Sequence, residues 1–281
     1  MTRETNVVLN FDAARDYLSE SVGKPQTIAP LPKVCAQLAQ LTAQQVTDAA
    51  QLARLIQSDP VLAGEIMRVA NSPAFRPRTA IVSLQQAVSW LGVAEVRNIA
   101  MTVMLRGEVF VAPGHEPESE ELWREAWLAG LWAKEIARER RKHVESAFLS
   151  ALMHRTGAAL ALKILSRFEL ERRTVMDTHN FGELIVEFEP TFGHLLMDSW
   201  LLPKDVQAGA TDWRNYRESS HSDLAGTVHA AHLFARHTMY PQLMSEDQLI
   251  EDPVFEELGV FPENRRTMLA KQDHVRSLAG M

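Results

Sequence analysis

The residues of this chain whose types and spacing best suit chemistry are a histidine and the arginine next to it. An uncharged, mostly apolar run at residues 147–153 leads directly into His154 and Arg155. The imidazole of His154 is a suitable ligand for a transition metal. A divalent cation needs anionic or neutral ligands, however, and the guanidinium of Arg155 is neither. This pair therefore favours a binding site over a catalytic metal centre.

Two other groups of polar residues are weaker candidates for a site. His229 and His232 stand three residues apart, on one face of a helix, which is more typical of a hydrogen-bonding helix face than of a ligand set. Residues 138–143 form the one basic cluster, and cations at the end of a helix complement its dipole. The alternative is that this cluster binds nucleic acid or a cyclic dinucleotide, but no glycine-rich loop or aromatic interleaving accompanies it.

Composition and charge exclude several classes of function. The chain has 281 residues, of which 46% are hydrophobic and 23% are charged, as in an ordinary globular protein. Its formal net charge is -7, so nucleic acid is not an expected partner. The single cysteine, Cys35, excludes an internal disulfide and a thiolate-rich metal site, and its apolar neighbours predict that it packs in the core.

Membrane insertion is not expected either. The first residues lack the basic start and apolar stretch of a signal peptide. The longest uncharged run, residues 79–94, is shorter than the roughly 18 apolar residues of a membrane span, and it contains two glutamines. We therefore expect a soluble protein of the cytoplasm that does not contact a membrane.

The elements that must position these residues are predicted to be helices, because apolar residues recur at spacings of three and four along most of the chain. Asp59 is expected to cap a helix that begins at Pro60, where the missing N–H costs nothing. Asn71 and Ser72 are expected at its end, where helix carbonyls need partners. We expect these polar residues to be structural hydrogen-bonding groups rather than ligand contacts.

Further signals divide the chain into short helices. Residues 83–86 have the pattern of a capping box, and Gly92 suits the position after a helix. Residues 112–121 are rich in Pro, Gly and acid and are the expected linker, with a long helix at 122–141 behind it. Other helices are predicted at 148–153, 158–168, 192–201 and 224–237, with two more in the tail after residue 241. Short helices joined by tight turns imply a compact orthogonal bundle.

Several motifs resemble one known family. Residues 52–60, with Asp59-Pro60 at their end, and residues 66–72, which end in Asn71-Ser72, are similar to the N-terminal signature of HDOD domains. Residues 81–92, 96–98, 122–123 and 200–203 support the resemblance, which covers roughly residues 31–240. HDOD proteins are non-catalytic relatives of the HD metal-dependent phosphohydrolases in bacterial signalling and regulation.

The resemblance implies an all-α fold, namely a multi-helix orthogonal bundle similar to HD domains, with a smaller helical N-terminal subdomain. We expect a leader helix or extension at residues 1–30, the N-terminal subdomain at 31–111 and the linker at 112–121. A degenerate HD-like subdomain is expected at 122–240, and a helical tail at 241–281. Arg68 and Arg97 are expected on a solvated helix face, with a phosphate or carboxylate contact as the alternative.

The resemblance also implies where a metal site would have been. An HD hydrolase holds its metal with a histidine, an adjacent His-Asp pair and a later aspartate, and some relatives add histidines. His154 is retained, but Arg155 stands in place of the aspartate. Exchanging an anionic ligand for a cation costs on the order of several kcal/mol, even at an effective dielectric near 20. The other positions align with Glu125, Glu189, Trp213-Arg214 and His232.

We therefore expect a non-enzymatic regulatory module that needs no cofactor. It would act in signal transduction by binding a protein partner or a small signalling ligand at the vestigial pocket. Formation of a homo-oligomer is a further alternative. The alternative is a divergent metal-dependent phosphohydrolase, because the substituted side chains are themselves chemically competent ligands for zinc, manganese or iron. These substituted ligands would be Glu125, His154, Glu189 and His232.

Overall fold

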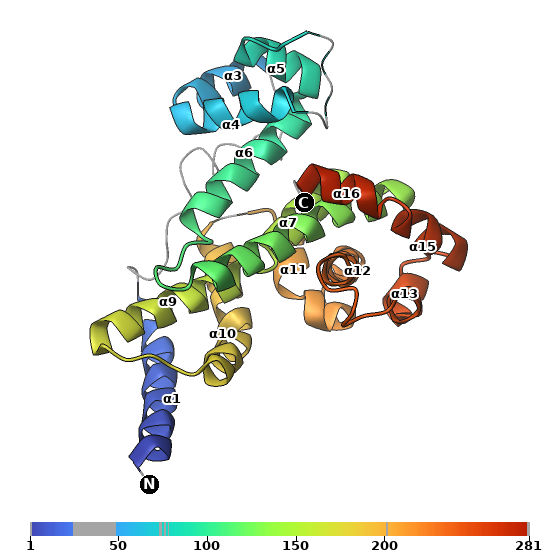
Figure 1. The fold of residues 1–281 in the computed structure, drawn as a ribbon. Helices are drawn as coiled ribbons and strands as arrows, with labels where there is room; N and C mark the ends of the chain where they lie inside the picture. Colours follow the sequence, from blue (N-terminus) through green and yellow to red (C-terminus); the bar gives the residue numbers. More distant parts are fainter. Residues whose placement is uncertain are drawn as a thin grey trace.

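The structure of the protein is a computed structural model that describes residues 2–24, 49–72, 75, 77, 79–200 and 202–279. All regular elements in these residues are helices, which confirms the predicted all-α fold (Figure 1). The predicted core position of Cys35 and the start of the expected N-terminal subdomain lie outside the described residues.

Residues 49–108 form a group of short helices followed by a longer one. Helices α3 (Ala49–Gln57), α4 (Pro60–Ala70) and α5 (Leu84–Leu91) pack together at the top of Figure 1, and α6 (Val93–Glu108) leads from them to the rest of the molecule. Their inward faces carry fully buried aliphatic side chains, whose burial from water is the main force that holds short helices in place. These are Leu52, Ile56, Leu62 and Ile66.

Polar side chains cap α4 at both of the ends that the sequence predicted. The carboxylate of Asp59 accepts hydrogen bonds from the backbone N–H groups of Val61 (3.0 Å) and Leu62 (3.1 Å). The side chain of Asn71 donates to the carbonyls of Met67 (3.0 Å) and Ile81 (2.9 Å) and accepts from the N–H of Ile81 (2.8 Å). Asn71 therefore ties the end of α4 to the segment that enters α5.

Two ion pairs join α6 to the remaining bundle. The guanidinium of Arg97 lies 2.7 Å from Glu145, and the ammonium of Lys134 lies 2.6 Å from Glu95. Arg97 is only 8% exposed, so its expected place on a solvated helix face is wrong and the alternative, a carboxylate contact, holds. The charge is buried because Glu145, 48 positions along the chain, supplies its partner, which the local sequence does not reveal. Arg68, in contrast, is exposed and pairs with Glu65 on its own helix.

The larger bundle is arranged around α7 (Glu116–Glu139). Helices α8 (Val144–Met153) and α12 (Ser222–Met239) pack along α7, while α9 (Thr156–Arg172) and α10 (Thr178–Ser199) form a second pair that also contacts α1 (Thr2–Ser21). Around this frame lie five short helices: α11 (Lys204–Thr211), α13 (Glu246–Ile250), α14 (Pro253–Glu257), α15 (Pro262–Leu269) and α16 (Gln272–Ala279). A 3-10 helix, η1 (Trp213–Glu218), separates α11 from α12.

Some predicted helix boundaries are wrong. Helix α7 begins at Glu116 rather than at residue 122, so the second half of the expected linker is helical. Its first turn holds Glu116 and Glu118, and negative charge there interacts favourably with the helix dipole. Helix α10 begins at Thr178, long before the predicted residue 192, because the carboxylate of Asp177 caps it and Pro190 is tolerated inside it. Helices α11 and α13 and the 3-10 helix were not predicted.

One stretch of the described chain is long and apolar enough by composition to cross a membrane, residues 144–172. It consists of two helices, α8 and α9, and 94% of its most apolar window is buried inside the protein. A bent pair, α5 and α6, also passes the composition test but turns by 113° between its two halves. The first stretch is thus a core element, which explains its apolar composition.

Gly157 allows α9 to cross α10 at very close range. A Cβ atom at this position would lie 2.1 Å from the carbonyl oxygen of Glu189 and 2.7 Å from the backbone nitrogen of Gly193. Backbone atoms held in a helix do not move aside as a flexible side chain does, so only glycine fits here. The close crossing also brings Arg155, two residues earlier, next to the side chain of Glu189.

The substitution Gly157→Ala tests this crossing. Because the added methyl group would displace backbone, we expect the free energy of unfolding to fall by about 3 kcal/mol or more, measured by urea denaturation followed by circular dichroism. Gly182→Ala, inside α10 with no atom near the added Cβ, is the matched control and should raise stability by about 1 kcal/mol. Equal stability of Gly157→Ala and the wild type would contradict the close approach.

Candidate functional site

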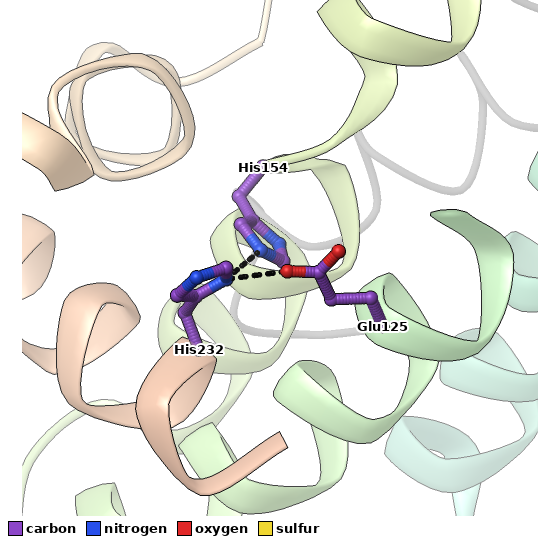
Figure 2. Close-up of side chains that lie close together, drawn as sticks. All are labelled: Glu125, His154 and His232. Atoms are coloured by element: carbon purple, nitrogen blue, oxygen red, sulfur yellow. Dashed lines mark hydrogen bonds and ion pairs between the residues drawn. The ribbon is translucent and has the colours of Figure 1, made fainter. Parts of the chain in front are cut away.

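Three side chains from different helices meet inside the larger bundle (Figure 2). Glu125 comes from α7, His154 follows the last residue of α8, and His232 comes from α12. One potential ligand atom from each lies within 4.8 Å of the others. The Nδ1 atom of His232 is 2.8 Å from Oε1 of Glu125 and 3.2 Å from Nε2 of His154. The three residues that the sequence separates by up to 107 positions are therefore neighbours in space.

The orientation of His154 follows from its position at the end of α8. Its Nδ1 atom lies 2.5 Å from the carbonyl oxygen of Ala151, which accepts a hydrogen bond from it. Nδ1 must then carry the proton, so in the neutral ring Nε2 is an acceptor that faces Nδ1–H of His232. Oε1 of Glu125 accepts no hydrogen bond, although Nδ1 of His232 lies close to it. The contact between these two atoms is therefore electrostatic.

Arg155 points into the same region and holds two carboxylates. Its Nε atom is 3.3 Å from Oε2 of Glu125, and its Nη1 atom forms an ion pair with Oε1 of Glu189. The second oxygen of Glu189 pairs with the guanidinium of Arg214. Glu125, Arg155 and Glu189 are each at most 9% exposed. The result is a chain of alternating charges, Glu125–Arg155–Glu189–Arg214, hereafter the ion-pair chain, which is buried except at the exposed Arg214.

Burial and charge set the protonation states in this region. Burial alone would raise the pKa of Glu125, but Arg155 and His232 together hold that pKa well below its usual range. Burial lowers the pKa of both His154 and His232 below the ordinary value of 6.5, and the neighbouring His232 lowers the pKa of His154 further. Burial opposes the charge on Arg155, yet Glu125 and Glu189 raise its pKa overall. His154 and His232 are therefore neutral, and Glu125 and Arg155 are ionised, at neutral pH.

Trp213 closes one side of the histidine pair. Its ring centroid lies 5.1 Å from that of His154 and 4.3 Å from that of His232, and the guanidinium of Arg214 covers it at 4.0 Å. A cavity of about 310 Å³ opens beside these residues and is lined by His154, Glu189, Trp213 and Arg214 among others. Its volume is at the lower end of the range found for small-molecule sites.

All six residues predicted for the vestigial pocket lie in this one region. They are Glu125, His154, Arg155, Glu189, Trp213 and His232. The sequence aligned Trp213-Arg214 with a position of the family's metal site, but it did not predict that Arg214 supplies the second cation of the ion-pair chain. Nδ1 of His229 lies 3.0 Å from the carbonyl oxygen of Trp213, and His229 does not line the cavity.

The predicted structural residues and the basic cluster lie away from the pocket. Asp59, Pro60, Asn71, Ser72 and Arg97 belong to α4, its end and α6. Within the basic cluster, Arg140 pairs with Asp223 and Arg138 with Glu135, so internal carboxylates neutralise these two cations.

A divalent metal does not fit these residues, although the spacing of three ligand atoms is compatible with coordination. The ion-pair chain contains two carboxylates and two guanidiniums, so its charge is already balanced. Both remaining ligands are neutral imidazoles. A buried divalent ion needs anionic compensation, and here the carboxylate nearest to the histidines is already paired with Arg155.

The fold and the site together define a class of protein: an all-α bundle in which an arginine neutralises the carboxylates near a pair of buried histidines. The particular family follows from comparison with known sequences. The model of the HDOD domain matches residues 28–214, and the chain belongs to the HDOD family. A search of curated proteins finds no match.

Solved structures share this fold over nearly the whole chain. An HDOD domain protein of unknown function from Geobacter sulfurreducens is 16% identical with a TM-score of 0.74, and the match covers 98% of this chain and 97% of that one. A "Putative metal-dependent phosphohydrolase" from Shewanella amazonensis SB2B is 18% identical with a TM-score of 0.70, covering 96% and 99%. A "Putative signal transduction protein" from Marinobacter aquaeolei VT8 is 20% identical with a TM-score of 0.67, covering 96% and 66%. At such identities the likeness shows the fold alone.

The buried neutral histidines make stability depend on pH. Because the folded pKa values of His154 and His232 lie below the unfolded value, the unfolded chain binds protons first as the pH falls. Their stabilising contribution is complete above about pH 7 and is lost below it, by up to about 1.4 kcal/mol per pH unit for each histidine. Urea unfolding at pH 7.5, 6.5 and 5.5 measures this slope. His154→Gln should reduce it, and His179→Gln, at an exposed site, should not. An identical slope in His154→Gln and the wild type would refute the assignment.

Proposed function

We propose that this HDOD protein is a non-catalytic regulatory module of the bacterial cytoplasm that acts in signal transduction by binding a protein or a small ligand. The observation that carries the proposal is the guanidinium of Arg155 between the carboxylates of Glu125 and Glu189. In this arrangement an internal cation takes up the negative charge that a metal centre would require. The name of the similar protein from Marinobacter aquaeolei VT8, which refers to signal transduction, agrees with such a role.

The magnitude of the charge conflict supports a binding role over catalysis. A divalent ion held by Glu125 would stand on the order of 5 Å from the guanidinium of Arg155. At an effective dielectric of 20 the repulsion is about 7 kcal/mol, which corresponds to several orders of magnitude in affinity. No other carboxylate of the ion-pair chain is free to offset it, because Glu189 is shared by Arg155 and Arg214. The adjacent cavity of about 310 Å³ is open to a small ligand without any metal.

Metal analysis tests the proposal. Protein purified from cells grown with added zinc, manganese and iron should contain less than about 0.1 metal ion per chain, because the site lacks net negative charge. It should also fail to hydrolyse bis(p-nitrophenyl) phosphate with any of these ions. Stoichiometric metal together with phosphodiesterase activity would overturn the proposal.

The variant Arg155→Asp tests the cause. Replacing the guanidinium by a carboxylate removes the repulsion and returns an anionic ligand next to His154. We expect the variant to gain thermal stability when Zn²⁺ or Mn²⁺ is added, whereas the wild type should not respond. Arg155→Leu, which removes the cation without adding a ligand, is the matched control and should respond less than Arg155→Asp. A wild type that responds to metal as strongly as Arg155→Asp would contradict the role given to Arg155.

A divergent metal-dependent phosphohydrolase is the second candidate, and one observation favours it: Glu125, His154 and His232 converge within 4.8 Å. If those residues hold a metal, each of Glu125→Ala, His154→Ala and His232→Ala must abolish both metal content and turnover. Metal content that does not change across this series would exclude the candidate.

A further inference from the structure

The cavity beside His154 combines an apolar wall with a charged rim. It lies between α10, α11 and η1, and its volume is about 310 Å³. Met153 and Met197 line it and are each only 1% exposed, so they belong to its interior. Asp212 and Arg214 also line it but are partly exposed, so they lie at its mouth. Such a combination is common in sites for small molecules.

The charged groups that line the cavity leave it with a net negative charge. The ion-pair chain contributes Glu189 and Arg214, and it is neutral as a whole because it holds two carboxylates and two guanidiniums. The other two groups are the carboxylates of Asp212 and Glu218. Within the described part of the chain, neither of them pairs with a lysine or an arginine. His194, whose Nε2 lies 3.6 Å from Oδ1 of Asp212, can offset one of these two charges at most.

The carboxylate of Asp212 is held in a fixed position at the mouth of the cavity. Its Oδ1 accepts a hydrogen bond from the hydroxyl of Thr211 (2.7 Å), and its Oδ2 accepts one from the hydroxyl of Ser219 (2.6 Å). Each carboxylate oxygen can accept two hydrogen bonds, so one acceptor position on each oxygen stays available to a ligand. Because the walls of a cavity have a low dielectric constant, they focus the field of such a carboxylate and attract cations.

The same charges disfavour an anionic ligand. A phosphoester or a cyclic dinucleotide in the cavity would face the carboxylates of both Asp212 and Glu218, and like charges across an interface weaken binding. The guanidinium of Arg214 offers little compensation, because it already pairs with Glu189 and packs over the ring of Trp213 at 4.0 Å. The charge of the cavity therefore selects positive ligands over phosphorylated ones.

An organic cation fits this cavity better than a metal ion. Neither Asp212 nor Glu218 belongs to a group of three potential metal ligands among the described residues. An ammonium group needs only one carboxylate and a few acceptor atoms, and its alkyl chain gains from contact with an apolar wall. Asp212 supplies the first requirement, and Met153 and Met197 supply the second.

We propose that the cavity beside His154 binds an alkylammonium group, with Asp212 as its counter-ion and its alkyl chain against Met153 and Met197. The proposal rests on the non-catalytic binding role proposed above, and it names the chemistry of the ligand. The alkylammonium group belongs either to a free small amine or to a lysine side chain of a partner protein. The cavity is thus a site for positive ligands on a fold whose hydrolytic relatives act on phosphoesters.

A series of three small probes with the same alkyl chain tests the charge preference. Butylammonium, 1-butanol and butyrate are titrated against the full wild-type chain at constant ionic strength, and binding is followed by saturation-transfer NMR. We expect saturable binding of butylammonium with a dissociation constant on the order of 1 mM, as befits so small a ligand. Butanol and butyrate should each bind at least tenfold more weakly. Ethylammonium, which lacks two methylene groups, should bind about tenfold more weakly.

Two charge-matched variants locate the binding. Asp212→Asn removes the counter-ion and should weaken butylammonium at least tenfold without changing the binding of butanol. Asp198→Asn removes one negative charge at an exposed position of α10 outside the cavity and should leave both ligands unaffected. Urea unfolding verifies that each variant is folded. If Asp212→Asn does not fold, the probe series on the wild type still decides the proposal.

A fifth probe, Nα-acetyl-lysine methylamide, distinguishes the two sources of the alkylammonium group. Binding at least tenfold tighter than that of butylammonium assigns the cavity to a lysine of a partner protein. Equal or weaker binding assigns it to a free amine.

Three outcomes would overturn the proposal. They are the absence of saturable butylammonium binding up to about 50 mM, binding of butyrate as tight as that of butylammonium, and equal effects of the two variants on butylammonium. Any of them in a protein that is free of metal and inactive would remove the alkylammonium site and leave the non-catalytic role intact. Metal content and phosphodiesterase activity, in contrast, would overturn the non-catalytic role itself.

Discussion

The position of the Arg155 guanidinium between two buried carboxylates is the interaction on which the rest of this structure depends. Removing one partner of such a buried pair typically costs 3–5 kcal/mol, roughly a third or more of the stability of a domain. The pair also fixes geometry, because Glu125 lies on α7, Arg155 precedes α9 and Glu189 lies on α10. The bare backbone of Gly157 lets α9 approach α10 closely enough for the pair to form. The side chain of Arg155 thus links the packing of α7, α9 and α10 to the charge of the pocket.

The electrostatics of the pocket support the proposed binding role. With the carboxylates neutralised and the histidines uncharged, the pocket offers hydrogen-bonding groups and an aromatic wall, which suit recognition better than hydrolysis. The ion pairs Arg97–Glu145 and Lys134–Glu95 couple α6 to the helices that hold the pocket.

The sequence predicted what local chemistry determines and missed what distant partners determine. The cap at Asp59, the proline start of α4 and the glycine after α5 are set by neighbouring residues, so they were placed correctly. The six pocket residues were predicted from the family resemblance and from the cation of Arg155 next to His154, not from the helical periodicity. The burial of Arg97 depends on Glu145, 48 positions away, and the extent of α10 depends on packing that tolerates Pro190, so neither was foreseen. The role of Arg214 likewise required knowing where Glu189 lies.

A double-mutant cycle between Arg155 and Glu189 tests the central claim most directly. The free energies of unfolding of the wild type, Arg155→Leu, Glu189→Leu and the double variant are measured by urea denaturation in the presence of a chelator. If the guanidinium neutralises the carboxylate in the core, the coupling energy should be about 2 kcal/mol or more. A coupling energy below about 0.5 kcal/mol would show that the two charges act independently, and it would contradict the account.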